Sequence, residues 1–434
     1  MMGRYILLFL FLLALFPPSL GDALPRYVFL FIADGLGQEE IDLYMALAAA
    51  RGRIPAFADF PIQVFLDNRT AQGGIPDSAS AATSIACGVK VSQGVLGVDD
   101  QGRPLENVAQ VAKNQGFRVG IVTNVAVNDA TPAAFYAHVP SRKSYDDIAW
   151  QLVESGFDLF VGSGIASSGK ASRERILALA RKKGYRVIQD PAAFFSLKPA
   201  SLPVIAFLPF TFAIDRMDPA PSLASSVRKA IELLQDSPGF FLVVEGGRID
   251  WCNHTNDIAS SLAEVEDFEA AVRVALSFGK AHQDETLILV TADHDTGGLM
   301  FRRNPLPRIP PQAFSYERFL AKLRTTPKKE EALFALFVST WGEETLQGLG
   351  EELARASSEF LVHGNGNALW IRLVRLLAER EGLFWSTTGH TACPVPLYAW
   401  GESSQVFQNA SSNTDIAKFL KALFRAQVVS EEVF

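Results

Sequence analysis

Cysteine is scarce in this chain, and positive charge is not in excess. The 434 residues include three cysteines, Cys87, Cys252 and Cys393, which cannot all pair within one chain. They are too widely spaced for a cysteine-rich zinc cluster, so we expect buried free thiols. The formal net charge of -7 shows no basic footprint, which argues against a nucleic acid partner.

Long apolar runs are also scarce after the N-terminal segment. One run, from Tyr5 to Phe16, follows Arg4 and is followed by Pro17, Pro18 and small residues. It is shorter than the roughly 20 apolar residues that a membrane-spanning helix needs. The pattern is typical of a secretory signal peptide, so we predict that residues 1–22 are removed and that the mature protein is periplasmic or secreted. The alternative is an uncleaved membrane anchor; no later stretch resembles a membrane span.

What the chain does contain is a repeated succession of apolar runs and amphipathic helical patterns. Its 48% hydrophobic and 20% charged residues are typical of a globular protein with a large core. Buried strands are predicted at Tyr27 to Ile32, Arg118 to Val122, Phe240 to Val244, Thr286 to Ala292 and Leu397 to Trp400. Strands that alternate with helices predict an α/β fold with a doubly wound, mostly parallel sheet flanked by helices on both faces.

One segment departs from this succession. From about residue 302 to 384 the sequence becomes proline-rich and then strongly helical, with charged faces. We therefore expect a single domain over residues 23–434 with a helical subdomain inserted at about 302–384. The insertion could serve as a lid or as a dimer surface.

Acidic and imidazole side chains follow the predicted strands, at the edge of a parallel sheet where binding sites collect. They are Asp34 after the first strand, Glu245, Asp250 and His254 after the third, Asp293 and His294 after the fourth, and His390 before the last. A lone aspartate at a strand end is more often a helix cap. Four such places together favour a metal site instead, because carboxylate and imidazole form a ligand set that zinc prefers.

The spacing of these residues suggests two metal ions. Asp250 and His254 are four positions apart, so they share one face if the segment is helical. Asp293 and His294 are adjacent at a strand end, where a turn lets both side chains converge. Paired metals clamp the attacking and leaving oxygens of an in-line phosphoryl displacement.

Ser78 in "IPDSASAATSIACG" stands at the predicted start of a helix. Backbone N–H groups and the helix dipole favour an anion there, and a nearby metal can activate a serine hydroxyl. Taken alone, an Asp-Ser pair is more often a helix cap. The candidate metal ligands elsewhere are what make Ser78 a candidate nucleophile.

Seven stretches occur together in an order typical of one enzyme family: "ADGLG", "PDSASAAT", "GVLGVD", "NDATPAAFYAHVPSRKSYDD", "VEGGRIDWCNH", "TADHDTGG" and "TTGHTA". By these motifs the chain resembles the alkaline phosphatases, over most of residues 27–300 and a short piece around 386–400. The resemblance implies metal-dependent hydrolysis of phosphate monoesters through a phosphoserine intermediate. Ser78 would be the nucleophile, and Arg142 would hold two phosphate oxygens, a task for which a planar guanidinium is suited.

The resemblance also implies three metal ions, two zinc and one magnesium. The zinc ligands would be Asp250, His254 and His390 for one ion, and Asp34, Asp293 and His294 for the other. Asp34 would also border the magnesium site, completed by Asp129, Thr131 and Glu245, because a hard cation prefers oxygen ligands. Without the resemblance, Asp129 and Thr131 would pass for a turn or a helix cap. The family commonly dimerises, which allows a homodimer here.

Some residues depart from the pattern or stand outside it. Trp251 lies where the family often has lysine or histidine, so phosphate affinity and the third metal are less securely implied. We expect His282 and His363 to be exposed and Asp295 to be a turn residue or a supporting residue. His138 could orient Arg142, although a packed or capping histidine is an equal alternative.

Two other functions remain open at this point. A relative within the same superfamily could prefer phosphodiesters, whereas a sulfatase is disfavoured because "PDSASAAT" lacks the cysteine-based signature of that family. A protein of a different class could bind metal or phosphate without catalysis, with the helical insertion as an interaction module.

Overall fold

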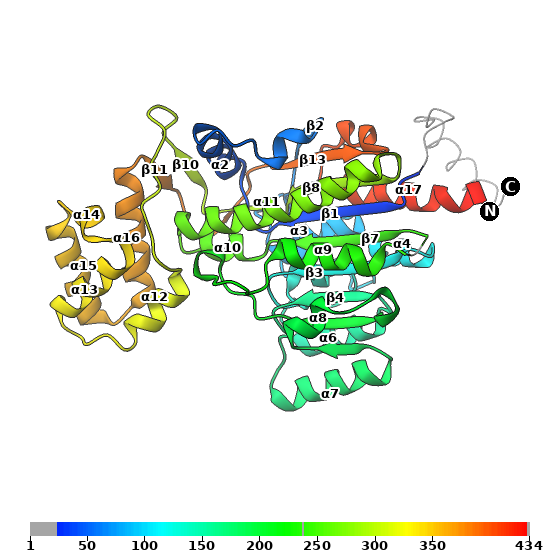
Figure 1. Ribbon diagram of the computed structural model, residues 1–434, viewed down its shortest axis with the longest axis horizontal. Coiled ribbons are helices and arrows are strands. Elements are labelled where there is room, and N and C mark those ends of the chain that lie inside the picture. The colour runs from blue at the N-terminus through cyan, green and yellow to red at the C-terminus, as the bar shows by residue number, and fades with distance from the viewer. Residues whose placement is uncertain (1–23, 237, 432–434) are drawn as a thin grey trace.

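The sheet at the centre of the molecule is built from strands that the apolar runs form. The computed structural model describes residues 24–236 and 238–431, so the predicted signal peptide lies outside the described residues. Within them, nine strands form one sheet in the order β2-β13-β8-β1-β7-β3-β4-β6-β5 (Figure 1). Their bounds are β1 Tyr27–Ala33, β2 Ile62–Leu66, β3 Arg118–Thr123, β4 Leu159–Gly162, β5 Arg186–Ile188, β6 Val204–Phe207, β7 Phe240–Glu245, β8 Thr286–Ala292 and β13 Val395–Gly401.

The direction of the strands confirms the predicted doubly wound, mostly parallel sheet. Strand β13, which pairs with β2 and β8, runs in the opposite direction to the other eight strands of the sheet. The central strand β1 lies between β7 and β8, with Tyr27 opposite Phe240 and Thr286. All of its residues are buried because helices cover both faces. Of the nine strands, β2, β4, β5 and β6 were not predicted: three have four residues or fewer, and β2 is a partly exposed edge strand.

Helices cover the two faces of the sheet. One face carries α9 (Leu223–Leu234) and α11 (Ile258–Ala281); the other carries α3 (Ser78–Cys87), α4 (Val108–Asn114), α5 (Ala130–Ala133) and α17 (Thr414–Glu431) (Figure 1). The remaining helices of this part are α2 (Gln38–Ala50), α6 (Tyr145–Glu154), α7 (Lys170–Lys182), α8 (Pro191–Phe195) and α10 (Arg248–Asn253). Short 3₁₀ helices connect them at η1 Ala56–Asp59, η2 Pro199–Ser201, η3 Ala213–Asp215, η4 Gln283–Glu285 and η5 Ser404–Asn409.

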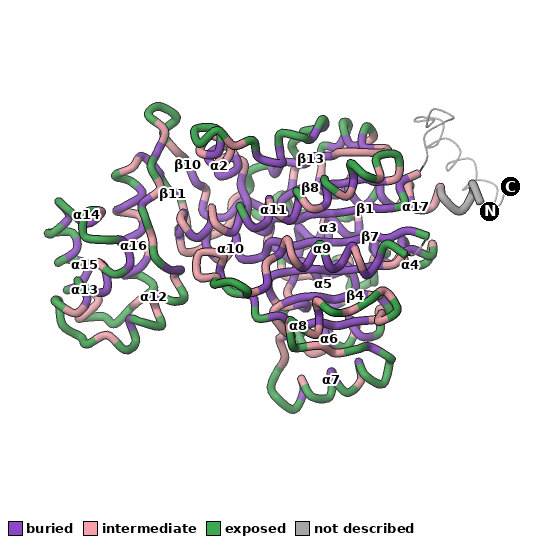
Figure 2. Tube along the Cα trace, viewed as in Figure 1, coloured by how far each residue is buried: buried purple, intermediate pink, exposed green. Residues whose placement is uncertain are grey.

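The segment that departs from the α/β succession forms a helical lobe at one end of the molecule (Figure 1). Its helices are α12 Tyr316–Leu323, α13 Glu330–Trp341, α14 Glu343–Leu346, α15 Gly350–His363 and α16 Gly366–Arg380. Their apolar faces enclose a separate core that includes Phe319, Phe337 and Trp370. The outer sides of these helices are largely exposed, whereas the main sheet is buried (Figure 2). We call this segment, residues 302–384, the helical insertion.

Two small antiparallel pairs lie between the main sheet and the helical insertion. Strand β10 (Leu299–Phe301) pairs with β11 (Leu383–Trp385), and β9 (Asp295–Thr296) pairs with β12 (His390–Thr391). Both pairs join segments that are about 90 residues apart in the chain, which brings the two ends of the insertion together. Among the described residues, none of the helices combines the length and the apolar character that a membrane crossing requires.

The cysteines only partly follow the prediction. Cys87 and Cys252 are buried free thiols, as expected. Cys393 is free but exposed, so the expectation that all three are buried was wrong. It lies in the irregular segment between β12 and β13, on the surface rather than in an element that faces the core.

Candidate active site

Three acidic residues meet at the carboxyl edge of the sheet because their strands are parallel neighbours. Asp34 follows β1, Glu245 ends β7, and Asp293 follows β8. In the register of these strands, Ile32 lies opposite both Glu245 and Thr291. The backbone N–H of Gly35 donates to Asp293 Oδ1 over 3.0 Å, which ties the two strand ends together. Carboxylates from three adjacent strands therefore share one edge of the sheet.

The serine that the sequence singled out opens helix α3. Asp77 is the N-cap: it accepts from the backbone N–H of Ser80, and the Ser80 hydroxyl completes a capping box. Ser78 is the first residue of the helix and is 3% exposed. Its Oγ lies 3.3 Å from His294 Nε2. The cap explains why the helix starts here, and it leaves the Ser78 hydroxyl directed at the acidic edge of the sheet.

Asp250, His254 and His390, which we call the Asp250 group, converge from α10 and β12. One ligand atom from each lies within 4.8 Å of the others. His254 Nε2 is 3.3 Å from Asp250 Oδ2 and 3.1 Å from His390 Nε2. The Nδ1 atoms of the two imidazoles lie 2.6 Å from the Thr388 carbonyl and 2.9 Å from the Pro76 carbonyl. Each Nδ1 therefore faces an acceptor and carries a proton, so in the neutral ring, the form that binds a metal, Nε2 holds the lone pair.

When both rings are neutral, their Nε2 lone pairs face each other over 3.1 Å, an arrangement that a cation bound between them would stabilise. The same reasoning applies to Asp34, Asp293 and His294, which we call the Asp34 group. Their ligand atoms also lie within 4.8 Å of one another. Asp34 Oδ1 and Asp293 Oδ2 are buried and have no hydrogen-bond partner. Buried oxygens without a partner are costly, so both groups fit divalent cations.

The electrostatics of the Asp34 group agree with this fit. Burial raises the pKa of Asp293 to about 7, and the negative charge of Asp250 acts in the same direction. Burial, together with the charge of Asp293, holds the pKa of Asp34 well above its usual range. Burial also lowers the pKa of His294 to about 3, helped by repulsion from His390. Protein groups alone thus leave these carboxylates poorly charged, and a cation would favour their ionised form.

Asp250 has the opposite shift. Burial alone would raise its pKa, but the hydrogen bond and charge of His254 and the hydroxyl of Thr296 lower the pKa of this carboxyl below its usual range. Thr296 Oγ1 donates to Asp250 Oδ1 over 2.6 Å. Sequence reasoning missed Thr296, although it lies within "TADHDTGG", because a threonine in a turn gives no signal of its own.

Oxygen ligands gather next to the Asp34 group. Thr131 Oγ1 donates to Asp34 Oδ2 over 3.3 Å, and the Thr123 hydroxyl at the end of β3 donates to Glu245. Burial holds the pKa of Glu245 well above its usual range. Asp129 caps α5 and lies close enough to Glu245 for its charge to raise the pKa of that carboxyl further. Thr123 is a second residue that the sequence did not identify.

Arg142 lies between two carboxylates. Its Nη1 donates to Asp77 Oδ2 over 3.4 Å and its Nη2 to Asp129 Oδ1 over 3.2 Å. Asp77 caps the helix that starts at Ser78, so the guanidinium is held beside that serine. These contacts orient a planar donor group next to the candidate nucleophile.

The remaining histidines and Trp251 lie apart from these contacts. His363 is exposed, whereas His282 is partly buried against the rings of Tyr27 and Phe278, so its predicted exposure was only partly right. His138 Nε2 lies 2.9 Å from the Leu105 carbonyl, a packing role rather than a contact with Arg142. The Trp251 ring has the Arg248 guanidinium 5.3 Å from its centroid.

Asp295 has a supporting role, as expected. It accepts from Thr391 Oγ1 over 2.6 Å, across the β9–β12 pair that carries His390. The carboxylate also packs against Gly37, where a Cβ would lie 1.9 Å from Asp295 Oδ1. A residue larger than glycine at position 37 would therefore displace this strand pair.

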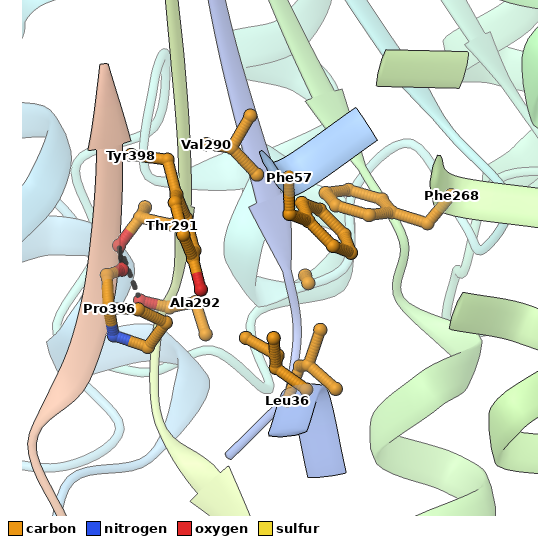
Figure 3. Close-up of a pocket in the computed structure, with 10 residues that line it drawn as sticks. Leu36, Phe57, Phe268, Val290, Thr291, Ala292, Pro396 and Tyr398 are labelled. Carbon is orange, nitrogen blue, oxygen red and sulfur yellow. Dashed lines mark hydrogen bonds between the residues drawn. The ribbon is translucent and has the colours of Figure 1, made fainter. Parts of the chain in front are cut away.

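A small apolar cavity lies beside β1 and β8, the strands that lead to Asp34 and Asp293 (Figure 3). Its lining includes Leu36 and Phe268, together with Val290 and Ala292 of β8 and Tyr398 of β13. Thr291 in this wall donates to the Pro396 carbonyl over 2.7 Å, which joins β8 to β13. Ala292 in this wall directly precedes Asp293, so the packing of these apolar residues helps to fix the strand end that carries the carboxylate.

Comparison of the sequence with known proteins identifies the family of this chain. The model of the family described as alkaline phosphatase matches residues 25–159 and 161–426. Alkaline phosphatase 4 of Bacillus subtilis is 31% identical, over 80% of this chain and 76% of that protein. The repressible alkaline phosphatase of Saccharomyces cerevisiae is 30% identical, over 91% of this chain and 81% of that protein.

Solved structures agree with the sequence comparison. The alkaline phosphatase of Thermus thermophilus superposes with a TM-score of 0.78 at 26% identity, covering 93% of this chain and 92% of that chain. The cold-active alkaline phosphatase of a Shewanella species gives a TM-score of 0.77 at 28% identity, covering 92% and 99%. The chain therefore belongs to the alkaline phosphatase family, enzymes that hydrolyse phosphate monoesters.

Proposed function

We propose that this enzyme transfers the phosphoryl group of a monoester to Ser78 and then to water. The observation that carries the proposal is the position of the Ser78 hydroxyl, buried at the start of α3 and 3.3 Å from His294 of the Asp34 group. A nucleophile at this place faces the paired ligand groups, where a phosphate would be neutralised. No other serine of α3 has its hydroxyl in contact with either group among the described residues.

We further propose the metal content that the donor sets favour. The Asp250 group and the Asp34 group each combine carboxylate with imidazole, as zinc prefers. Asp34, Asp129, Thr131 and Glu245 offer oxygen only, as magnesium prefers. When bound, such a pair of zinc ions supplies positive charge for both the attacking and the leaving oxygen.

The residues of the chain would act in two displacements. In the first, Ser78 Oγ gives up its proton and forms a bond to phosphorus, while the bond from phosphorus to the alcohol oxygen breaks and that oxygen takes up a proton. In the second, a water oxygen gives up a proton and forms the new bond to phosphorus, while the bond from phosphorus to Ser78 Oγ breaks and Ser78 Oγ takes up a proton. Helix α3 begins at Ser78, so its N-terminal dipole would favour the anion in both steps.

Arg142 would hold the two phosphate oxygens that do not react. Its guanidinium is oriented by Asp77 and Asp129, so little side-chain freedom is lost when phosphate binds. A fork of two parallel donors also fixes the orientation of the phosphorus relative to Ser78. Arg142 thus binds and orients the group that is transferred.

The site of action follows from the N-terminal sequence. Residues 1–22 have the pattern of a secretory signal peptide, so we propose that the mature enzyme works in the periplasm or outside the cell. Phosphate monoesters present there would be its substrates.

A matched pair of variants tests the nucleophile. Ser78→Ala should keep its metals and lose nearly all phosphate release, because no other group can accept the phosphoryl. Ser84→Ala removes a hydroxyl from the same helix that bonds only to the Ser80 carbonyl, so it should stay active. Metal analysis and phosphate release are measured on both purified mature proteins; an active Ser78→Ala enzyme that holds its metals would refute the assignment.

The same assay separates the competing functions. A chelator should abolish phosphate release, and zinc should restore it; a protein that only binds metal or phosphate would release none in either state. The ratio of kcat/KM for a phosphate monoester to that for a diester should favour the monoester. A preference for the diester would reassign the substrate class while it left Ser78 as the nucleophile.

A further inference from the structure

The helical insertion is joined directly to the segments that form the site. It begins after β10, which follows the turn after Asp293 and His294, and it ends at β11, shortly before His390. Strands β10 and β11 pair with each other, so both connections leave the main domain at one place (Figure 1). An insertion that enters and leaves beside the site can transmit its position to the site residues.

The contact that links them runs through the turn after α10. Asn256 in this turn is fully buried, and its backbone has φ 54°. Asparagine adopts this left-handed conformation more readily than other residues that have a side chain. Its Oδ1 accepts from Arg375 Nε of α16 over 2.7 Å, and its Nδ2 donates to the Thr387 carbonyl over 3.0 Å.

The next residue after Thr387 completes the connection. The carbonyl of Thr388 accepts from His254 Nδ1 over 2.6 Å, and this bond directs His254 Nε2 toward Asp250 and His390. We propose that Arg375 is a positioning residue: through Asn256 and the backbone of Thr387 and Thr388, the helical insertion holds the His254 imidazole in its metal-binding orientation. This inference rests on the proposed role of His254 as a zinc ligand.

A second set of contacts fixes the same turn. Gln312 Nε2 donates to Asp257 Oδ1 over 2.8 Å, and the backbone N–H of Tyr316 donates to Asp257 Oδ2 over 3.3 Å. Asp257 is the N-cap of α11, so it belongs to the main domain. Residues from the first and last parts of the insertion therefore form hydrogen bonds with two successive residues, Asn256 and Asp257.

The loss of Arg375 would affect His254 because Asn256 is fully buried in the native structure and its Oδ1 would lose its guanidinium donor. The loss of a donor at a buried oxygen is costly, so the Asn256 side chain would rearrange. The bond from Asn256 to the Thr387 carbonyl would then weaken, and Thr388 would no longer be held at the distance that orients His254. Supporting contacts of metal-binding histidines typically change metal affinity about 10-fold or more.

Zinc binding by the full mature chain tests the proposal. Each protein is equilibrated with zinc at free concentrations set by a chelator, and bound zinc per chain is measured. His254→Ala identifies which binding step belongs to the Asp250 group. Arg375→Ala should weaken that step about 10-fold and leave the step of the Asp34 group unchanged. Arg375→Lys, which keeps a cationic donor, should recover most of the affinity.

Two further variants make the result specific. Arg372→Ala removes a guanidinium from the same helix that pairs with Glu359 on the surface of the insertion, so zinc binding should not change. Asn256→Gly removes the link while it suits the left-handed backbone, and it should weaken the same step as Arg375→Ala. If Arg375→Ala fails to fold, Asn256→Gly provides the same measurement.

The outcomes separate this inference from the proposed function. Unchanged zinc affinity in Arg375→Ala and Asn256→Gly, or equal weakening in Arg372→Ala, would overturn the inference while the wild-type enzyme still binds two zinc ions. If the wild-type chain binds no zinc, or if His254→Ala alters no step, the proposed function fails and the inference fails with it.

Discussion

Glu40 is a buried carboxylate that connects the helices around the site, and its effect on stability can be measured. This carboxylate of α2 is 2% exposed and accepts from the Ser261 hydroxyl and from Asn253 Nδ2. Asn253 belongs to α10 and also donates to the Gly35 carbonyl over 3.2 Å, next to Asp34. Glu40 thus ties together α2, α10 and α11 without contacting a candidate metal ligand.

The structure sets the size and sign of its effect on stability. Burial raises the pKa of Glu40 from 4.5 to about 7, although hydrogen bonds from Ser261 and Asn253 act in the opposite direction. The folded protein therefore binds a proton more tightly than the unfolded chain. Its contribution to stability is fully present below the unfolded pKa and is lost as the pH rises through the folded pKa. One pKa unit corresponds to about 1.4 kcal/mol, so the loss amounts to about 3 kcal/mol.

Glu40→Gln should remove this pH dependence. The amide oxygen can still accept from Asn253 and the amide nitrogen can donate to Ser261 Oγ, so the shape and the hydrogen bonds are kept. Relative to wild type, the free energy of unfolding of the variant should rise by about 3 kcal/mol between about pH 4 and about pH 8. Urea unfolding at a series of pH values, with zinc and magnesium in excess, measures this difference.

A neighbouring residue supplies the control. Glu39 lies one position earlier on α2, has a half-exposed side chain and pairs with Arg303 on the surface. Glu39→Gln should therefore show no comparable change with pH. The reasoning would be refuted if the stability difference between Glu40→Gln and wild type stayed constant over this pH range, because Glu40 would then be as well solvated as Glu39.

Two further predictions concern packing and accessibility. Gly37→Ala should lower the free energy of unfolding by about 1–3 kcal/mol, because its Cβ would lie 1.9 Å from Asp295 Oδ1 and would displace the β9–β12 pair. Urea unfolding measures this change, and a variant as stable as wild type would contradict it. In the native protein a thiol reagent should modify Cys393 alone among the three cysteines, and Cys87 and Cys252 should react only on unfolding. Peptide mass analysis identifies the modified residue. Rapid reaction of Cys87 in the native protein would contradict its burial.

The strand ends show how much of this molecule could be predicted from its sequence. Strands β1, β7 and β8 are continuous apolar runs because both of their faces are buried, and such runs are visible in any sequence. Once they are placed side by side in parallel, Asp34, Glu245 and Asp293 must share one edge. The short strands β4, β5 and β6 could not be predicted, because runs of three or four residues are too short to show a period and are equally compatible with part of a helix.

Residues that support the site left no comparable signal. Thr296 and Thr123 act through one hydroxyl each, and threonines in turns and at strand ends are common. Arg375 lies in a helix whose charged face looks like any solvated surface, and its partner Asn256 is 119 positions away. Such residues acquire a role only through tertiary contacts, which neither spacing nor periodicity records.

The orientation of the imidazoles also depends on contacts that the sequence does not show. His254 and His390 could be selected from the sequence because histidine is rare, with six in the chain. What makes their Nε2 atoms available is a pair of backbone carbonyls, from Thr388 and Pro76. Every residue has a carbonyl, so no side-chain pattern can reveal which one accepts. The pairing of β9 with β12 brings the Thr388 segment to His254. The helical insertion lies between these two strands in the chain, so a segment that carries none of the family motifs can influence the geometry of the site.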